Sequence, residues 1–299
     1  MRNIDLDSLH IFKAVVDYGG ITKAASQLNR VQSNITTRVK NLEDRLGVKL
    51  FQRQSGKLVL SSEGKLLLSY ADRLLRLSSE AEAALRNSVP QGTLRLGTME
   101  STAAARLPPV LSHYHQHYPE VQIELVTGTS GALIGKIHRF EVEAAFVAKP
   151  FVATDLEMQE AFSEELVLIA PRNAPPVKTP KDLRKHTVIA FSTGCSYRRI
   201  LEDWLGMSSV VPDRVLELAS YHAIVACVAA GSGIAIVPRS VLAVVRAEND
   251  VTISPLPERL ARVKTYLVWR SGHHSVALDA LREALPSTKP GNEPSRKLR

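Results

Sequence analysis

The 299-residue sequence predicts an α/β protein with a helical N-terminal head. Three observations lead to this fold class. Short helical patterns and a hairpin-like stretch fill residues 4–60, a long helical pattern covers 62–88, and strand-like and helix-like segments alternate from Thr93 onward. Such alternation is typical of an α/β body, and we expect its sheets to be mostly parallel.

Composition and charge distribution indicate the class of partner. Hydrophobic residues make up 44% and charged residues 23% of the chain, as in ordinary soluble globular proteins. The formal net charge is +8, and residues 20–60 alone carry eight Lys and Arg against two acids. A basic head on a nearly neutral body favours a polyanionic partner, although a basic solvated face would give the same numbers.

Cysteine content and hydropathy exclude several other classes. The two cysteines, Cys195 and Cys227, are too few for a disulfide scaffold or a four-cysteine zinc site, so we expect no metal or other cofactor. The first residues lack a signal-peptide pattern, which favours a cytoplasmic protein. Residues 218–238 are uncharged and long enough to span a membrane. Their glycines and polar residues instead predict a buried helix (221–230), a turn and a strand (234–237).

The head begins with three helical patterns. Apolar residues recur at helical spacing from Leu9 to Val16, and Gly19-Gly20 ends this helix. Thr22 can cap a short second helix. The third helix, Gln32–Leu46, has an inner apolar stripe with intervals of four, three and four residues.

The outer face of the third helix is dense in hydrogen-bonding groups. Its acids occur only in the last turns. A DNA recognition helix needs such N-terminal turns to meet base edges and phosphates, although a polar face in a small helical bundle is the plainer alternative. The outer residues are Gln32, Ser33, Asn34, Thr36, Thr37, Arg38 and Lys40.

A hairpin-like stretch follows the third helix. Ser55-Gly56 is a turn signal between Arg53 and Lys57, and apolar residues flank it. A hairpin here would carry Arg53, Gln54 and Lys57 toward a phosphate backbone. Residues 1–60 are therefore interpreted as a winged helix-turn-helix domain that binds double-stranded DNA.

The long helical pattern, assigned to residues 61–89, starts at Ser61, Ser62 and Glu63. Leu67, Leu74 and Ala81 recur every seven residues, which predicts pairing with a second helix, most simply that of another copy. Packing on its own domain is the alternative. Pro90 and Gly92 then break the helix and mark a hinge.

In the body, seven apolar runs after the first strand (93–98) are interpreted as strands, with helices between them. The basic tail, 287–299, is rich in Pro, Gly and charge and is predicted to be disordered. The predicted strands are 121–128, 143–148, 166–171, 187–191, 215–220, 233–238 and 265–270, and the predicted helices include 107–120, 196–205, 221–230 and 275–285.

Taken in order, these segments resemble the LysR-type transcriptional regulators over residues 5–285. The resemblance is carried by FKAVVDYGGITKAASQLNRVQSNITTRVKNLEDRLGVKLF, TLRLG, LPPVLSHYHQHYPEVQIELVTGTS and VACVAAGSGIAIVP. It implies a linker helix that pairs subunits, often within a tetramer. It also implies a body like a periplasmic binding protein, with subdomain I (90–163 and 267–286) and subdomain II (164–266) around an effector cleft.

The resemblance also implies roles for residues of the head. Gln32, Ser33, Thr36 and Arg38 fall where the family contacts DNA, and Arg53 falls at the wing arginine. Thr37 and Lys40 are expected to contact the backbone. Many relatives have proline and alanine where Ser33 and Asn34 stand, so the base preference of relatives does not transfer; the Asn34 amide could read adenine.

For the effector, the family's positions fall on loops at the carboxyl ends of strands. Helix N-termini there point into a crevice, and hydroxyls and free N–H groups suit a carboxylate, so we expect a small anionic metabolite. Ordinary helix capping is the alternative for each loop. The predicted residues are Glu100, Ser101, Thr102, Thr127, Gly128, Thr129, Ser192, Thr193, Gly194, Cys195, Ser220 and His222.

The sequence also allows other functions. Cys195 follows a glycine at a predicted helix start, where its thiol pKa could fall, so a redox sensor is conceivable. Competing functions are an effector-independent DNA-binding repressor or architectural protein, and a solute-binding or enzymatic α/β protein. The favoured reading is a regulator, not an enzyme, that acts as a homodimer or homotetramer, with RNA polymerase as a further candidate partner and no membrane contact.

Overall fold

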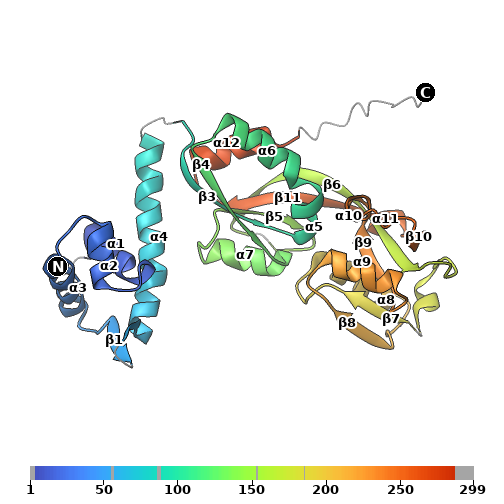
Figure 1. Cartoon of the computed structure of the whole chain (residues 1–299). Coiled ribbons are helices and arrows are strands. Elements are labelled where there is room, and N and C mark those ends of the chain that lie inside the picture. Colours follow the sequence, from blue (N-terminus) through green and yellow to red (C-terminus); the bar gives the residue numbers. More distant parts are fainter. Residues whose placement is uncertain (1–3, 55–56, 86–88, 153, 185, 287–299) are drawn as a thin grey trace. The chain divides into compact units, whose positions relative to one another are not determined.

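The computed structural model describes residues 4–54, 57–85, 89–152, 154–184 and 186–286. Contacts divide the chain into an N-terminal unit, Met1–Asn87, and a C-terminal unit, Ser88–Arg299 (Figure 1). The predicted wing turn at 55–56 and the predicted disordered tail at 287–299 lie outside the described residues.

The N-terminal unit consists of three helices, a hairpin and a long helix, in the predicted order. Strands β1 and β2 pair in antiparallel fashion. The elements are α1 (Leu6–Asp17), α2 (Ile21–Gln27), α3 (Gln32–Leu46), β1 (Phe51–Gln54), β2 (Lys57–Leu60) and α4 (Ser62–Leu85).

Local signals set the ends of these helices. The Asp5 carboxylate accepts the Ser8 N–H at 2.7 Å and caps α1. Ser61 Oγ likewise accepts the Gly64 N–H at 2.9 Å at the start of α4. The predicted Thr22 cap is wrong, because α2 already begins at Ile21 after Gly20, whose φ of 148° suits glycine.

The inner stripe of α3 forms the centre of this unit. Ile35 and Leu42 are fully buried, and Val39 nearly so. Ala24 of α2 is also fully buried, and its small side chain lets α2 and α3 approach closely. The helix-turn-helix is therefore held by a continuous apolar core, which leaves the opposite face of α3 free.

The C-terminal unit is built on a seven-stranded sheet with the order β10-β6-β11-β5-β3-β4, in which β9 also pairs with β6. Strands β7 and β8 form a separate parallel pair. The strands are β3 (Gly92–Thr98), β4 (Val121–Thr127), β5 (Ala144–Ala148), β6 (Leu156–Pro171), β7 (Thr187–Ala190), β8 (Arg214–Glu217), β9 (Ala235–Pro238), β10 (Val251–Pro255) and β11 (Arg262–Arg270).

Helices surround these strands (Figure 1). Two of them, α6 and α12, pack on each other through Tyr114, whose hydroxyl donates to the Ala277 carbonyl at 2.8 Å. The helices are α5 (Glu100–Ala105), α6 (Leu107–His117), α7 (Ser130–His138), a 3₁₀ turn (Pro180–Leu183), α8 (Ser196–Gly206), α9 (Tyr221–Ala229), α10 (Arg239–Val245), α11 (Glu258–Ala261) and α12 (Val276–Ala284).

The α/β class is confirmed, but the expectation of mostly parallel sheets is wrong. Strand β3 runs parallel to β4 and β5, whereas β11 is antiparallel to β5 and β6, and β6 is antiparallel to β9 and β10. The two long strands β6 and β11 account for the antiparallel pairs. Strand β11 runs antiparallel to β5, which belongs to the parallel part of the sheet, and β6 runs antiparallel to β11.

Several elements of the C-terminal unit were not predicted from the sequence. Strand β6 begins at Leu156, ten residues before the predicted strand. The sequence did not indicate this first part of the strand, because residues 157–165 include four glutamates and lack an apolar run. Pairing with β11 forms this part of the strand. Helices α5 and α10 and strand β10 were not predicted.

The uncharged segment 218–238 divides into α9 and β9, as predicted. In the described part of the chain, no helix is long and apolar enough to cross a membrane.

Candidate nucleic-acid interface and effector site

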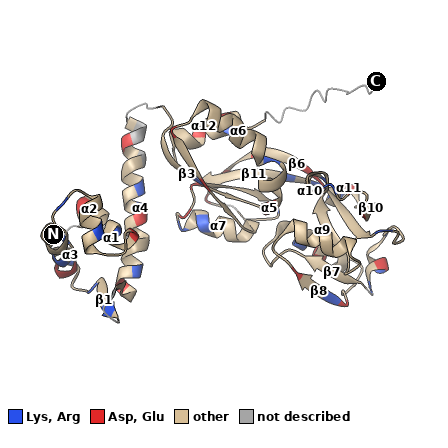
Figure 2. Cartoon of the chain, viewed as in Figure 1, with Lys and Arg blue, Asp and Glu red and all other residues tan. Residues whose placement is uncertain are grey.

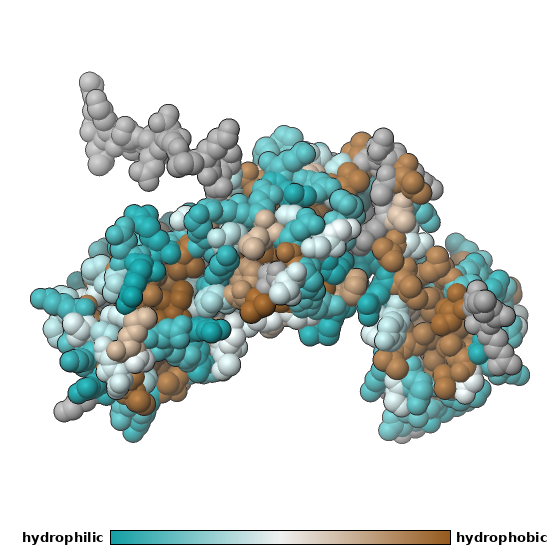
Figure 3. Space-filling view, turned by 180° about the vertical axis from the view of Figure 1, so that it is seen from behind, coloured by the Kyte–Doolittle hydropathy of each residue, from teal (hydrophilic) through white to brown (hydrophobic). Residues whose placement is uncertain are grey.

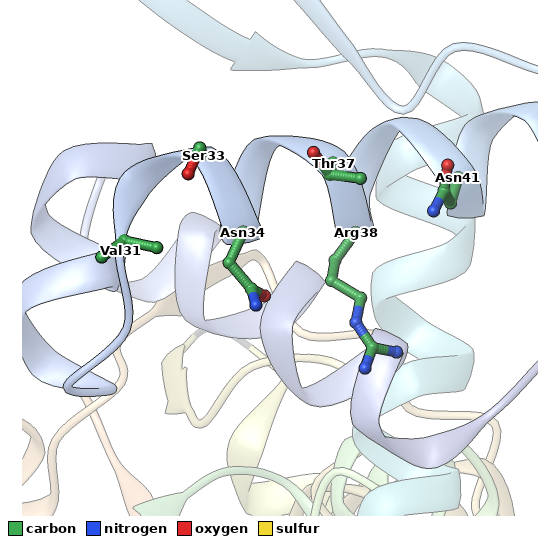
Figure 4. Close-up of a pocket in the computed structure, with 6 residues that line it drawn as sticks. All are labelled: Val31, Ser33, Asn34, Thr37, Arg38 and Asn41. Carbon is green, nitrogen blue, oxygen red and sulfur yellow. The ribbon is translucent and has the colours of Figure 1, made fainter.

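The outer face of α3 lies open to solvent, as the sequence predicts. Six of its seven predicted DNA-contacting residues are exposed, and Arg38 is half-buried. In Figure 4, Asn34 and Arg38 extend from the same side of α3. The exposed six are Gln32, Ser33, Asn34, Thr36, Thr37 and Lys40.

A pocket of about 340 Å³ follows this face of α3 (Figure 4). Asn34, Thr37, Arg38 and Asn41 line it together with Ser33 and Val31. Asn41 is absent from the predicted set. Its spacing of seven residues from Asn34 and three from Arg38 places it on the same helix face and could have revealed it.

Arg38 is held by an acidic residue of α1. Its Nη2 lies 3.4 Å from Asp7 Oδ2, and Arg30 binds the same carboxylate at 3.0 Å. Because all three side chains remain about two-fifths exposed, the pairing is weak and the Arg38 guanidinium can exchange Asp7 for another anion.

The Thr36 hydroxyl makes a local contact. It donates to the Gln32 carbonyl at 2.9 Å, a bond within the helix. This bond orients the Thr36 side chain along α3.

The wing hairpin begins beside the carboxyl end of α3. Arg53 of β1 is exposed and pairs in register with Leu58 (Figure 2 shows basic residues on this hairpin). The side chain of Lys57 lies outside the described residues.

Glu43, at the end of α3, ties the hairpin to the helix. It is buried and accepts the N–H groups of Leu50 at 2.8 Å and Phe51 at 3.3 Å, as well as Lys49 Nζ at 2.8 Å. Burial raises the pKa of Glu43, but these hydrogen bonds outweigh it and leave the pKa below its usual value.

Helix α4 divides its apolar residues between two faces. Ala71 is fully buried, and Leu67, Leu68 and Leu75 pack against the same core as Leu9 and Phe12. Leu67, the first residue of the predicted pairing repeat, thus packs on its own unit. The exposed apolar residues of α4 include Leu66, Tyr70, Leu74 and Leu77.

In the C-terminal unit, two hydrogen bonds join the predicted effector loops. Glu100 Oε1 accepts the Tyr221 N–H at 3.3 Å. The Gly131 N–H donates to the Gly194 carbonyl at 3.3 Å, and Thr129 caps α7 next to Gly194. The structure therefore brings the loops at 100, 129, 194 and 221 together.

Four buried hydroxyl groups of this unit make no hydrogen bond of ordinary geometry with the described residues, and they are here named the hydroxyl cluster: Ser101, Thr102, Tyr197 and Thr265. Burial raises the pKa of Tyr197, whose hydroxyl lies near Ser101 and Thr265. Buried polar groups are nearly always satisfied, so an unsatisfied group calls for a ligand or a water molecule.

Sequence reasoning found Ser101 and Thr102 but missed Tyr197 and Thr265. Tyr197 is the second residue of α8, and Thr265 lies on β11, far away in the chain, so only the fold brings them together. Other predicted residues stay exposed or half-buried at the surface of the unit: Thr127, Gly128, Thr129, Ser192, Thr193, Gly194, Ser220 and His222.

Glu100 is the ionisable group of this region. Its Oε2 is buried and has no partner in the described part of the chain. Burial raises its pKa, opposed by the Tyr221 N–H and by His222.

The environment of Cys195 argues against the redox hypothesis. Its thiol is buried, and burial raises its pKa despite its place at the start of α8. The expected lowering of its pKa is therefore wrong, because desolvation outweighs the helix N-terminus.

Family models match both parts of the chain. The model described as a bacterial regulatory helix-turn-helix protein of the lysR family covers residues 6–65, and that of the LysR substrate binding domain covers 87–289. The chain belongs to the LysR family of transcriptional regulators. It is accordingly a DNA-binding regulator with an effector-binding domain, and not an enzyme.

Curated relatives agree over nearly their whole lengths. The HTH-type transcriptional regulator YusT of Bacillus subtilis is 39% identical over 283 residues, 94% of each chain. The HTH-type transcriptional regulator GltR of the same organism is 35% identical and is covered to 90%, with 89% of this chain aligned. The HTH-type transcriptional regulator SoxR of an Arthrobacter species is 33% identical and fully covered, with 99% of this chain aligned.

Solved structures show the same fold at low sequence identity. A full-length OxyR variant from Pseudomonas aeruginosa superposes with a TM-score of 0.71 at 19% identity and covers 94% of both chains. Full-length CbnR in complex with its target DNA gives a TM-score of 0.66 at 22% identity, over 94% of this chain and 99% of that one. The LysR-family fold therefore extends through both units.

Proposed function

We propose that this LysR-family regulator reads its operator by placing α3 in the major groove. The observation that carries this proposal is the row of exposed polar side chains along α3, with Asn34, Thr37, Arg38 and Asn41 around one pocket. Asn34 and Asn41 carry amides, which suit adenine, and Arg38 suits guanine or phosphate. Arg53 and Lys57 of the wing then contact the phosphate backbone.

In this proposal Arg38 changes partner when DNA binds. In the free protein the Asp7 carboxylate pairs with the Arg38 guanidinium at 3.4 Å and also with Arg30 at 3.0 Å. A phosphate or a guanine edge would take the place of the exposed Asp7 carboxylate, and Arg30 would keep Asp7 paired. The remaining predicted contacts, Gln32, Ser33, Thr36, Thr37 and Lys40, flank Arg38 on the same helix.

The effector proposed for the C-terminal unit is a small anionic metabolite bound at the hydroxyl cluster. Ser101, Thr102 and Tyr197 carry buried hydroxyl groups that can donate hydrogen bonds to a carboxylate, in place of the contacts that Tyr197 has with Ser101 and Thr265. The exposed predicted residues would then form the rim of the site.

Assembly and location complete the proposal. A homodimer or homotetramer would present two or more copies of α3, since one recognition helix reads few base pairs. We place the protein in the cytoplasm, where it would reach DNA and RNA polymerase.

Operator binding tests the proposal. The Arg38→Ala and Asn34→Ala variants should each weaken binding to the DNA upstream of the chain's own gene at least tenfold, because each loses a base or phosphate contact of about 1–3 kcal/mol. Fluorescence anisotropy with labelled DNA at a fixed salt concentration measures this. The Arg214→Ala variant, which removes an exposed arginine of the C-terminal unit, is the matched control.

Binding of the Arg38→Ala and Asn34→Ala variants within twofold of the wild type would exclude α3 as the reading element. Equal loss for operator and random DNA in the Asn34→Ala variant would show a backbone contact and not base reading.

A further inference from the structure

A second pocket of the C-terminal unit contains none of the predicted effector residues. Its volume is about 330 Å³, and four cationic residues surround it: Lys149, Arg259, Arg262 and Lys264. This pocket, here named the basic pocket, is at the small end of the range of ligand sites.

The charge of the basic pocket is mostly uncompensated. Lys264 pairs with Glu160, and Arg259 Nη2 lies 3.1 Å from the Met207 sulfur, an uncharged partner. Among the residues that the structure describes, no carboxylate lies within ion-pair distance of Lys149, Arg259 or Arg262. Three like charges around one hollow repel one another, and a bound anion would relieve this repulsion.

The remaining wall of the basic pocket is apolar. Ile200, Leu260 and Tyr266 contribute to it. The Tyr266 ring is fixed by an edge-on contact with Phe151 at 6.4 Å between centroids, and Lys149 Nζ lies 5.2 Å from the centre of the Tyr266 ring. The pocket thus offers an aromatic and aliphatic surface beside its positive charge. Inorganic phosphate would contact only the charged part, whereas an organic anion could contact both parts.

Strand β11 connects the basic pocket to the hydroxyl cluster. Arg262, Lys264 and Tyr266 alternate along this strand and line the pocket. Thr265, between two of them, points to the other side of the strand, where it lies near Tyr197. The two sites are therefore distinct, although they share one strand.

We propose that the basic pocket binds an organic anion with an apolar body, such as an aromatic carboxylate. The carboxylate lies among Lys149, Arg259 and Arg262, and the apolar body lies against Tyr266, Leu260 and Ile200. This site does not depend on the identity of the effector at the hydroxyl cluster.

Calorimetric titration of the full chain with 2-naphthoate tests the inference. The wild type should bind it saturably, and 2-naphthamide, which has the same ring system without the charge, should bind at least tenfold more weakly. The Lys149→Gln/Arg262→Gln variant should weaken naphthoate binding at least tenfold. The matched control, Lys181→Gln/Arg214→Gln, also removes one lysine and one arginine from the surface and should bind like the wild type.

The Ser101→Ala/Thr102→Val variant of the hydroxyl cluster, here named the cleft variant, separates this inference from the proposed effector site. The Lys149→Gln/Arg262→Gln variant is named the pocket variant. Naphthoate binding that survives in the cleft variant and is lost in the pocket variant supports the basic pocket. The opposite pattern assigns the ligand to the hydroxyl cluster and overturns the inference. Absence of saturable binding, equal affinity for the amide, or equal loss in the matched control also overturns it.

Discussion

At the scale of single residues, buried polar groups with complete partners hold the DNA-binding head together. Glu43 shows this most clearly, since its one carboxylate joins the end of α3 to the first residues of the wing. In the sequence, Glu43 is only one of the acids in the last turns of α3. Its role depends on the backbone N–H groups of Leu50 and Phe51, which turn toward it only in the folded domain.

Replacement of Glu43 by Gln should lower the free energy of unfolding of the N-terminal unit by about 1 kcal/mol. The amide oxygen can still accept the Leu50 and Phe51 N–H groups, but it lacks the negative charge that strengthens these bonds and pairs with Lys49. The pKa of Glu43 is lower in the folded state than its ordinary 4.5. Its stabilising effect is therefore present above pH 4.5 and is lost as the pH falls through the folded-state pKa.

Urea unfolding of the wild type and of Glu43→Gln from pH 7 to pH 3 measures this effect. The difference between them should shrink below pH 4.5, whereas Glu120→Gln, at an exposed site, should change little. A difference independent of pH would contradict the ionised role of Glu43.

At the scale of elements, α4 has two apolar faces, and a single copy of the chain covers only one of them. One face, with Ala71, packs on its own unit, and the other, with Leu66, Tyr70, Leu74 and Leu77, remains exposed. Figure 3 shows apolar side chains gathered on the surface of this unit. The seven-residue repeat correctly predicted the helix but placed Leu67 on the pairing face. Spacing alone cannot tell which of two apolar faces packs on the helix's own unit and which stays exposed.

The exposed face of α4 predicts the outcome of a charge substitution. Leu74→Glu/Leu77→Glu should shift the chain toward monomer by at least tenfold in its dissociation constant, since two carboxylates would face their copies across the pairing helices. Sedimentation velocity over a concentration series measures the shift. The Glu82→Ala variant, on the same helix, is the control, and an unchanged dimer in the double variant would show that another surface pairs the subunits.

At the scale of the whole molecule, few polar contacts join the effector loops of the C-terminal unit. Ser196 Oγ contacts Ser130 Oγ at 3.0 Å and also donates to the Ala148 carbonyl. Arg106 forms a two-pronged pair with the buried Glu164 of β6, which also accepts the hydroxyl of Ser240 from α10 at 2.7 Å. A ligand at the hydroxyl cluster would lie among these contacts and change how firmly they hold.

Ligand binding at the hydroxyl cluster is tested on the full chain with a library of small aliphatic carboxylates, which lack the apolar body that the basic pocket would bind. At least one should raise the melting temperature of the C-terminal unit, because a ligand that binds only the folded state stabilises it by mass action. The Ser101→Ala/Thr102→Val variant should lose this shift, while Lys149→Gln/Arg262→Gln should keep it. If no carboxylate shifts the wild type, the anionic effector is excluded.

The sequence by itself determined the helix-turn-helix, its exposed polar face, the long helix and the α/β class, because these depend on local periodicity and on ordered motifs. Tertiary structure alone decided the antiparallel course of β6 and β11, the burial of Cys195, and the meeting of Ser101 with Tyr197 and Thr265. These features depend on strand pairing and desolvation between residues far apart in the chain, which no local pattern records.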